Sequence, residues 1–219
     1  MEKKIWYIYG AGGLGRECLD IIKNDVSFES NNFEIRFLED NPSQDYCNNH
    51  KIEKFKNHKS KSFITIAVGE PSLRKKLYEK IRKTDLKMRA AVHRSSVIGD
   101  KVKISKGAII APLCSIQANA SIETNALINT LSIVGHDCVV KKHGVLSSMV
   151  NLGGSVRVGE GAFIGMCASI KENVKIGKNA IVSMTSGVYR DVAKDIIVVG
   201  NPARPSKMNT SRKVFKSRI

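Results

Sequence analysis

The strongest constraint on the fold is a six-residue hydrophobic period in the second half of the chain. Counting every sixth residue onward from Ile98 returns an aliphatic side chain at each step, without a failure. These residues are Ile98, Ile104, Ile110, Ile116, Ile122, Ile128, Val134, Val140, Leu146, Leu152, Val158, Ile164, Ile170, Ile176, Val182 and Val188. Because only about half of all residues are apolar, chance would break such a register within a few steps. The period therefore indicates a structural repeat.

Small side chains occupy a second position of the same repeat. Two residues before each aliphatic stands a small residue or Val, as at Ala108, Cys114 and Gly144. Residues two apart in an extended strand point to the same side, so each hexad sends one large and one small side chain inward. This pattern predicts a hexapeptide-repeat parallel β-helix. A β-sandwich is disfavoured because its turn clusters would recur every 8 to 12 residues, roughly, with a drifting register.

The turns of the predicted β-helix are marked by glycine. Glycine often follows the aliphatic residue, as at Gly135 and Gly153. We expect these glycines to provide the room that a turn between short strands needs. If three hexads form one triangular coil, the interior is filled by side chains, and any ligand must bind on the outside.

The first 90 residues lack this repeat and show a different pattern of apolar residues. Residues 4–9 are an apolar strand-like run, "GAGGLG" follows, and residues 16–24 have helical spacing. Further strands are predicted at 33–38 and 63–68, and a basic helix at 73–83. Strands that alternate with helices predict a small parallel sheet covered by helices, an α/β unit. The sequence thus divides into an α/β domain at 1–90, a β-helix at 91–190 and a C-terminal segment with a basic tail at 191–219, with a short helix near 188–195.

The glycine-rich loop raises the question of a dinucleotide site. "GAGGLG" fits the G-x-G-x-x-G pattern, but the pattern alone is weak evidence. A complete dinucleotide fold needs two mononucleotide-binding halves, whereas this domain has room for one. A nicotinamide oxidoreductase is therefore disfavoured. A glycine turn that only packs the helix on the strand stays an open alternative to a phosphate site.

Composition narrows the class of protein. A hydrophobic fraction of 42% suffices for a globular core, and neither a leader-like segment nor a membrane-length apolar run is present, so we expect a cytoplasmic protein without membrane insertion. Five scattered cysteines without C-x-x-C spacing argue against disulfides and a zinc site, so no metal is expected. The net charge of +16 is compatible with anionic ligands, but aromatic residues make up only 6%, which disfavours nucleic acid.

One histidine of the repeat has the context of a catalytic base. His136 follows Gly135 on a predicted coil edge and precedes Asp137. Gly154 should lie beside His136 one coil later, where its backbone N–H could face an oxyanion. His143 is the competitor within the repeat, whereas a structural role is the default for the other three histidines, which are His50, His58 and His93.

These features together resemble a known family. A β-helix with "INTLSIVGHDCVV", preceded by a short domain with "IYGAGGLGRE" and closed by "VVGNPARP", is similar to the sialic acid O-acetyltransferase and nucleotide-aminosugar N-acetyltransferase family. The resemblance covers essentially the whole chain. It implies a left-handed β-helix after a Rossmann-like domain, a homotrimer, acetyl-CoA as co-substrate and a nucleotide-linked amino sugar as acceptor, in bacterial surface-glycan biosynthesis.

The resemblance also implies roles for single residues. His136 would be the general base of a direct transfer, with Asp137 as the acid that raises its basicity and Asn129 near the acceptor. Gly154, Met166, Met184, Arg204 and Lys207 would contact acetyl-CoA in a groove between neighbouring β-helices. The nucleotide sugar would be held by Gly12, Gly13, Leu14, Glu39, Asp40 and Gly69.

The chain departs from the family at several positions. Leu14 stands where many relatives have His, Lys141 where they have Gly, and Val145 where they have a second coenzyme-contacting His. Two other functions therefore stay open beside N-acetylation. One is O-acetylation of a sugar such as sialic acid, and the other is a non-catalytic scaffold or nucleotide sensor.

Overall fold

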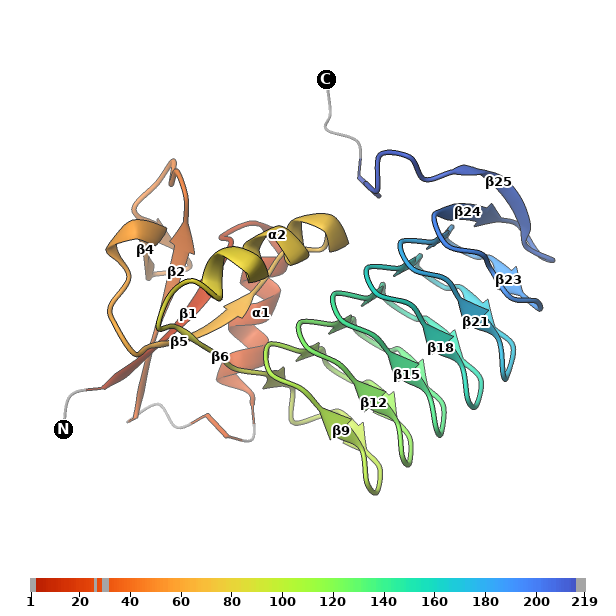
Figure 1. Ribbon diagram of the computed structural model, residues 1–219. Coiled ribbons are helices and arrows are strands. Elements are labelled where there is room, and N and C mark those ends of the chain that lie inside the picture. Colours follow the sequence, from red (N-terminus) through yellow and green to blue (C-terminus); the bar gives the residue numbers. More distant parts are fainter. Residues whose placement is uncertain (1–2, 26, 29–31, 216–219) are drawn as a thin grey trace.

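The computed structural model describes residues 3–25, 27–28 and 32–215, which form an α/β unit followed by a long β-solenoid (Figure 1). The sheet of the α/β unit has the strand order β3-β4-β2-β1-β5-β6. Its neighbouring strands are parallel except for β3 and β4. The strands are β1 (Lys4–Tyr9), β2 (Phe33–Glu39), β3 (Tyr46–Cys47), β4 (His50–Lys54), β5 (Phe63–Ile66) and β6 (Lys87–Met88).

Two helices cover opposite faces of this sheet. Trp6 and Ile8 of β1 share a buried cluster with α1 (Gly13–Lys23), whereas Tyr7 and Tyr9 point the other way, toward α2 (Pro71–Ile81). This alternation is expected of a strand buried on both sides. The three predicted strands and both predicted helices are confirmed, while β3, β4, β6 and the short 3₁₀ helix η1 (Phe55–Asn57) were not predicted from sequence.

The solenoid has three flat faces, each a parallel sheet of two-residue strands. Face 1 contains β7 (Ala91–Val92), β10 (Ile109–Ile110), β13 (Leu127–Ile128), β16 (Val145–Leu146), β19 (Phe163–Ile164) and β22 (Ile181–Val182), continued by β24 (Ile196–Val199) and the antiparallel β25 (Arg204–Met208). Face 2 contains β8 (Val97–Ile98), β11 (Ser115–Ile116), β14 (Ile133–Val134), β17 (Asn151–Leu152), β20 (Ser169–Ile170) and β23 (Gly187–Val188). Face 3 contains β9 (Lys103–Ile104), β12 (Ser121–Ile122), β15 (Val139–Val140), β18 (Arg157–Val158) and β21 (Lys175–Ile176).

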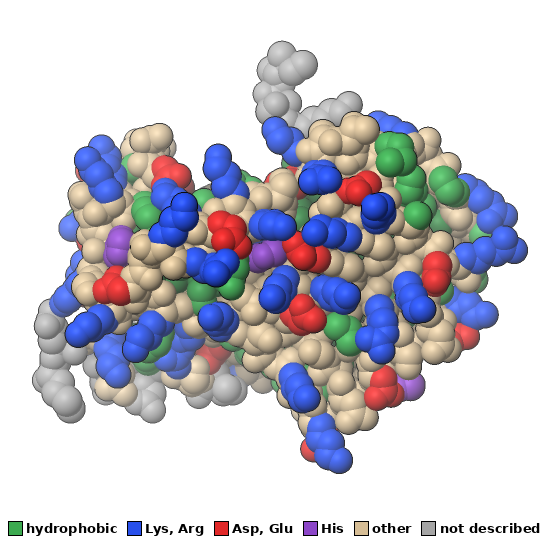
Figure 2. Space-filling view, in the orientation of Figure 1, with side chains coloured by type: hydrophobic (Ala, Val, Ile, Leu, Met, Phe, Trp, Pro, Cys, Tyr) green, Lys and Arg blue, Asp and Glu red, His purple; other side chains and the backbone are tan. Residues whose placement is uncertain are grey.

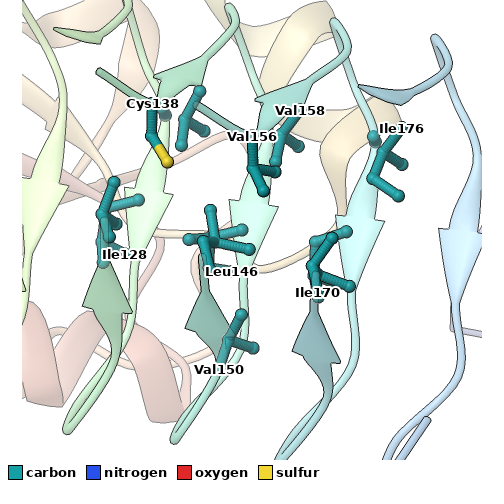
Figure 3. Packing of buried hydrophobic residues seen from close by; sticks show 14 of the residues in the cluster. Ile128, Cys138, Leu146, Val150, Val156, Val158, Ile170 and Ile176 are labelled. Atoms are coloured by element: carbon teal, nitrogen blue, oxygen red, sulfur yellow. The ribbon is translucent and has the colours of Figure 1, made fainter. Parts of the chain in front are cut away.

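The predicted stack of large and small side chains fills the interior. Ile128, Leu146 and Ile170 lie against the smaller Cys138 and the valines of neighbouring coils (Figure 3). Cys114 and Cys138 are almost completely buried, so both serve as small core residues, as expected. The first coil is the exception, because Ile98 is 39% exposed.

The glycines at the corners between faces provide room, as predicted. A Cβ on Gly135 or Gly153 would lie within 2.8 Å of the backbone of the next coil, and neither residue has a positive φ angle. Close approach of coils therefore requires these glycines. The left-handed backbone position falls two residues later, and non-glycine residues such as Asp137 (φ 61°) and His143 (φ 60°) occupy it.

A buried arginine joins the α/β unit to the solenoid. Arg74 of α2 is fully buried, and its Nη1 donates to the carbonyls of Ile66 and Val68, both at 2.9 Å. Its Nε and Nη2 donate to the backbone and side-chain oxygens of Asn125, at 2.9 and 2.8 Å. Burial lowers the pKa of Arg74 to about 9, which still leaves the guanidinium charged at neutral pH.

The segment after the last coil differs from the prediction. The short helix expected near 188–195 is absent, and this segment instead forms a bridge between Val192 and Ile176. The chain then adds β24 and β25 to face 1 (Figure 1). The backbone thus continues the parallel stacking of the coils in place of local helical bonding.

We predict that Arg74→Ala destabilises the protein by about 3 kcal/mol, because it leaves several buried carbonyl oxygens without donors. The free energy of unfolding, measured in urea, checks this. Arg82→Ala on the same helix is the control, since the Arg82 side chain is 61% exposed and should change stability by less than about 0.5 kcal/mol. Equal effects of the two variants would contradict the role of Arg74.

Candidate functional site

His136 and Asp137 form an exposed pair at the 2/3 edge, the corner between faces 2 and 3. The pair lies in the turn between β14 and β15, and the side chains are 61% and 50% exposed. His136 Nδ1 lies 2.7 Å from Asp137 Oδ2. The other carboxylate oxygen accepts a hydrogen bond from Asn119 Nδ2 at 3.1 Å. Hydrogen bonds from His136 and then from Asn119 hold the pKa of the Asp137 carboxyl below its ordinary value.

The second ring nitrogen of His136 faces the next coil. The carboxylate can only accept, so it selects the tautomer with the proton on Nδ1 and leaves Nε2 unprotonated in the neutral ring. A Cβ on Gly154 would lie 2.6 Å from Cε1 of His136 and nearer still to Nε2. Within the described chain, the Gly154 N–H has no acceptor, whereas its carbonyl accepts from Asn173 N at 2.9 Å. The His136 ring therefore lies against Gly154, a residue whose N–H is free to donate to a ligand.

His143, the competing histidine, has a structural environment. Its side chain is buried at the 3/1 edge, the corner between faces 3 and 1, with Nδ1 3.0 Å from Asn125 Nδ2 and the ring centroid 5.1 Å from that of Tyr78. Burial lowers the pKa of His143 to about 4, so the ring stays neutral at physiological pH. It is part of the contact between α2 and the solenoid and does not face solvent as His136 does.

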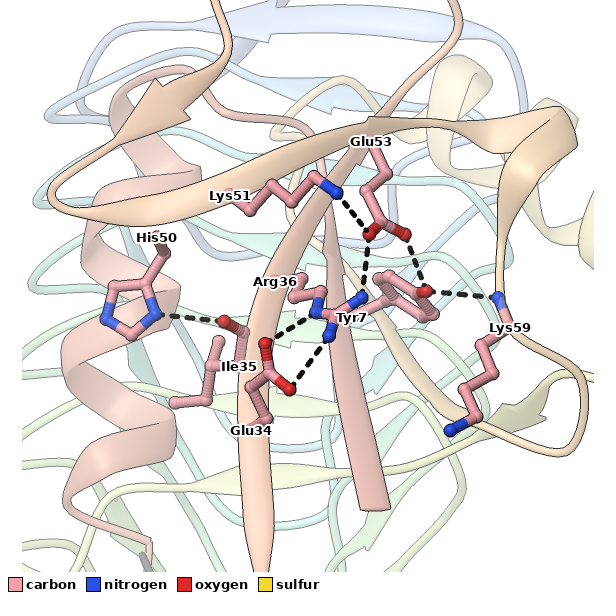
Figure 4. Close-up of polar contacts among 8 residues, drawn as sticks. All are labelled: Tyr7, Glu34, Ile35, Arg36, His50, Lys51, Glu53 and Lys59. Carbon is pink, nitrogen blue, oxygen red and sulfur yellow. Dashed lines mark hydrogen bonds and ion pairs between the residues drawn. The ribbon is translucent and has the colours of Figure 1, made fainter. Parts of the chain in front are cut away.

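The remaining histidines bond within the α/β unit or the first coil. His50 Nδ1 lies 2.9 Å from the carbonyl of Ile35, beside a polar network in which Arg36 joins Glu34 and Glu53 (Figure 4). His58 Nδ1 contacts the carbonyl of Phe55 at 2.7 Å, and His93 Nδ1 contacts Ser95 Oγ at 2.8 Å. These contacts agree with the structural role expected for all three.

A groove of about 870 Å³ lies between face 1 and the C-terminal segment. Met166 and Met184 line it from the 1/2 edge, the corner between faces 1 and 2, and Lys207 lines it from β25. Arg204, also expected beside the coenzyme, instead borders a separate hollow of about 420 Å³ with Arg190 and Val192. The groove is thus lined by Met166, Met184 and Lys207, three of the residues expected around the coenzyme, and not by Arg204.

The base and the groove lie on opposite edges of face 2. His136 and Gly154 are at the 2/3 edge, whereas Met166 and Met184 are at the 1/2 edge. Asn129 is also at the 1/2 edge, where its Oδ1 accepts from the Thr130 N–H at 2.8 Å. A single protomer therefore does not bring Asn129 or the groove to its own His136.

The glycine loop leads directly into α1. Gly12 is the residue before the helix, Gly13 begins it, and Leu14 packs partly buried against the cluster beneath α1. A Cβ on Gly12 or Gly13 would meet nothing within 4 Å, so open space surrounds both residues. The N-terminal N–H groups of an eleven-residue helix thus point toward accessible space, which suits an anionic ligand.

The acidic pair after β2 has partners within the chain. Glu39 Oε1 accepts from the Ala11 N–H of the glycine loop at 3.0 Å. Asp40 Oδ1 accepts from Tyr9 Oη at 2.6 Å and also pairs with Lys80, contacts that help to lower the pKa of its carboxyl against the effect of burial. Glu39 thus lies at the loop, while Asp40 is directed toward α2.

Gly69 lies against the C-terminal segment. A Cβ on Gly69 would lie 3.7 Å from the ring of Phe215, and the next residue, Glu70, accepts from the N–H groups of Val214 and Phe215 at 2.9 and 3.0 Å. The Phe215 ring in turn packs edge-on against Phe163 of face 1, with 5.7 Å between centroids. The groove is therefore walled by the tail as well as by the solenoid.

Sequence reasoning missed Asn119, Glu70 and Arg74. Asn119 could have been found by stepping one coil back from Asp137, as Gly154 was found by stepping one coil forward. Glu70 and Arg74 gave no comparable signal, because their partners are distant in the sequence.

The described part of the chain has a surface of mixed charge, and it offers neither a cluster of metal ligands nor a membrane-spanning helix. Basic side chains are dispersed among acidic ones over the face seen in Figure 2, and Lys75 and Lys178 both pair with Glu160. Within the described residues, no group of three or more His, Cys, Asp and Glu side chains could hold a metal ion. None of the described helices has the length and apolarity needed to cross a bilayer.

Comparison with known proteins finds relatives of both the α/β unit and the whole chain. Residues 6–81 match the family described as the PglD N-terminal domain. The chain is 29% identical over 213 residues to the GDP-perosamine N-acetyltransferase of Escherichia coli O157:H7, covering 93% of this chain and 96% of the relative.

Two solved structures share the fold. The acetyltransferase domain of PglB from Neisseria gonorrhoeae FA1090, in complex with acetyl coenzyme A, has a TM-score of 0.86 at 23% identity and covers 94% of this chain and 100% of that one. PerB from Caulobacter crescentus, in complex with CoA and GDP-perosamine, has a TM-score of 0.83 at 24% identity and covers 94% and 99%. Over nearly its whole length the chain is therefore similar to a nucleotide-aminosugar N-acetyltransferase and shares the fold of such enzymes, and it is an acetyltransferase.

Proposed function

We propose that this protein transfers an acetyl group from acetyl-CoA to the amine of a nucleotide-linked amino sugar in bacterial surface-glycan biosynthesis. The observation that carries the proposal is the His136–Asp137 pair with Nε2 directed at the backbone of Gly154. An unprotonated imidazole nitrogen and an available N–H are the two groups that acyl transfer to an amine requires.

The reaction proceeds by direct attack. The amine nitrogen of the sugar forms a bond with the thioester carbonyl carbon while His136 Nε2 accepts a proton from that nitrogen. Asp137 stabilises the imidazolium that results. The Gly154 N–H donates to the carbonyl oxygen as negative charge develops on it. The carbon–sulfur bond then breaks, and the CoA thiolate takes the proton from His136.

The amine acceptor is favoured over a sugar hydroxyl by the relatives. The relative from Escherichia coli is a GDP-perosamine N-acetyltransferase and aligns over nearly its whole length. PerB was solved with GDP-perosamine and CoA. We infer the same chemical class of acceptor here and leave its nucleotide to experiment, so that guanosine, uridine and thymidine diphosphates are all candidates. O-acetylation of sialic acid becomes an outcome of the test.

The groove on face 1 suits the coenzyme. Met166 and Met184 are 43% and 59% exposed and give it an apolar side, which fits a pantetheine arm. Lys207 gives it a cationic end, which fits a phosphate. Arg204 is outside this groove, so any contact with the coenzyme would have to come from another direction.

We infer a homotrimer with shared sites. Exposed apolar side chains line the 1/2 edge, including Leu113, Leu131 and Met149, which are 58%, 49% and 53% exposed. Contact between this edge of one protomer and the 2/3 edge of another would bury them. It would also bring the groove and Asn129 of one protomer to His136 of its neighbour.

We also infer that the α/β unit is a Rossmann-like domain for the nucleotide, that the solenoid is left-handed and that the protein acts in the cytoplasm. The open loop at Gly12, Gly13 and Leu14 supports phosphate binding at the start of α1. Glu39 beside this loop supports recognition of ribose or base. Asp40 and Gly69 follow the same ends of β2 and β5, the two parallel strands on either side of β1. The division into domains at 1–90, 91–190 and 191–219 is part of this proposal.

Thiol release from acetyl-CoA tests the proposal. The acceptors are GDP-perosamine, UDP- and dTDP-linked 4-amino sugars and free sialic acid, each with and without enzyme. Turnover with an amino sugar, together with an amide product, supports the proposal. Turnover with sialic acid alone would replace it with O-acetylation, and absence of both turnover and acetyl-CoA binding would favour a scaffold.

We predict that His136→Ala lowers kcat by about 100-fold to 10,000-fold, because the variant has no base within reach of the amine. Steady-state kinetics with the best acceptor of the panel measure this. His58→Ala is the matched control, because His58 bonds locally to the Phe55 carbonyl, and it should retain wild-type kcat. Full activity of His136→Ala would assign the proton transfer to another group.

We predict that Gly154→Ala lowers kcat by about 100-fold, because the new methyl group would overlap the His136 ring and displace Nε2. The far-UV circular dichroism of the variant should remain that of the wild type. Ser155→Ala, one residue further, adds no atoms near the ring and serves as the control. Unchanged kinetics in Gly154→Ala would place the thioester away from this backbone.

A further inference from the structure

The polar contacts behind His136 continue one coil back. Asp137 Oδ2 contacts His136 Nδ1 at 2.7 Å, and Asp137 Oδ1 accepts from Asn119 Nδ2 at 3.1 Å. Each carboxylate oxygen therefore has its own partner. We propose that Asn119 is a positioning residue that holds the Asp137 carboxylate, and through it the His136 imidazole, in the orientation of a general base. This inference rests on the proposed function.

The period of the solenoid explains why position 119 can do this. Asn119 precedes Asp137 by 18 residues and lies in the equivalent turn, between β11 and β12. The two residues have φ angles of 62° and 61°, and the Asp137 N–H donates to the carbonyl of Ala118 at 3.0 Å. Their side chains thus leave equivalent backbone positions in successive coils, one above the other.

The chemistry of the amide sets the direction of the hydrogen bond. An ionised carboxylate has no donor, so the Asn119 NH₂ group must face Asp137. With Oδ1 occupied in this way, Oδ2 is the oxygen that accepts from Nδ1–H of His136. Nδ1 keeps the proton, and Nε2 stays free to accept one.

The exposure of the pair makes such a support necessary. The side chains of His136 and Asp137 are 61% and 50% exposed, so packing alone does not fix their rotamers. A carboxylate held by only one partner would rotate, so that either of its oxygens could bind water in place of His136. The imidazole would then lose its orientation. Asn119 reaches neither the groove on face 1 nor Gly154 through any hydrogen bond in the described chain. Its effect should therefore appear in the chemical step and not in binding.

Asn119→Gly tests the proposal with little disturbance of the backbone. Glycine adopts a φ near 62° without strain, so the variant loses the amide and keeps the turn. We expect kcat to fall about tenfold, the equivalent of one lost hydrogen bond to a charged group, with KM for acetyl-CoA and for the acceptor unchanged. Lys101→Gly, at the equivalent position one coil earlier (φ 55°), is the matched control and should keep wild-type kcat.

A double-mutant cycle separates positioning from a general structural effect. In an Asp137→Ala background, Asn119 has nothing to hold, so Asn119→Gly should cause no further loss of kcat. The same tenfold loss in both backgrounds would overturn the proposal. A rise in either KM with constant kcat would overturn it as well.

A spectroscopic measurement tests the same point without turnover. The ¹⁵N chemical shifts of His136 at a pH where the ring is neutral should show the proton on Nδ1 in the wild type and a population with the proton on Nε2 in Asn119→Gly. Identical shifts in both proteins would overturn the role of Asn119. If this shift occurs although His136→Ala is fully active, the proposed base fails, while the positioning of Asp137 and His136 by Asn119 is supported.

Discussion

The structure depends on the vertical alignment of equivalent residues in successive coils. Backbone hydrogen bonds such as Ser155 N–H to the His136 carbonyl, at 2.8 Å, fix each turn above the one before it. The same alignment stacks the large and small side chains into a continuous dry core. Because that core has no room for a ligand, chemistry is restricted to the corners and edges. There, residues distant in sequence meet at fixed intervals.

Attachment of the α/β unit adds the second constraint. Arg74 binds carbonyls at the end of β5 and the Asn125 corner of the solenoid at once, so it fixes the orientation of one unit on the other. Glu70, four residues earlier, accepts from Ser72 Oγ through one carboxylate oxygen and from the tail through the other. The sheet, the solenoid and the C-terminal segment are thereby held together, and the last two line the groove. A charged side chain is tolerated inside because most of its N–H groups have carbonyl partners.

The parts of the fold that sequence could predict are those set by local periodicity. The hexad identified the interior positions because two independent constraints, size and spacing, recur at every step. The room needed at Gly135 was predicted, whereas the left-handed conformation at Asp137 was not, because several residue types tolerate it there. Arg74 could not be distinguished from the exposed lysines around it, since a basic helix usually indicates a solvated face. The contacts of Asp40 with Tyr9 and Lys80 could not be predicted, because they depend on tertiary packing, and its role in nucleotide binding stays a prediction.

The electrostatics of the candidate site connect catalysis to assembly. A hydrogen bond from one backbone N–H stabilises an oxyanion little in water and far more where water is excluded. In a single protomer, the side chains of His136 and Asp137 are 61% and 50% exposed, so the protomer alone does not exclude water from the site. The exposed apolar side chains Leu131 and Met149 lie on the opposite edge of face 2 and could provide it in a neighbouring copy. On this argument, the trimer we propose would assemble the two substrates and also lower the local dielectric constant around the base, so that loss of the trimer should abolish turnover even with His136, Asp137 and Gly154 intact.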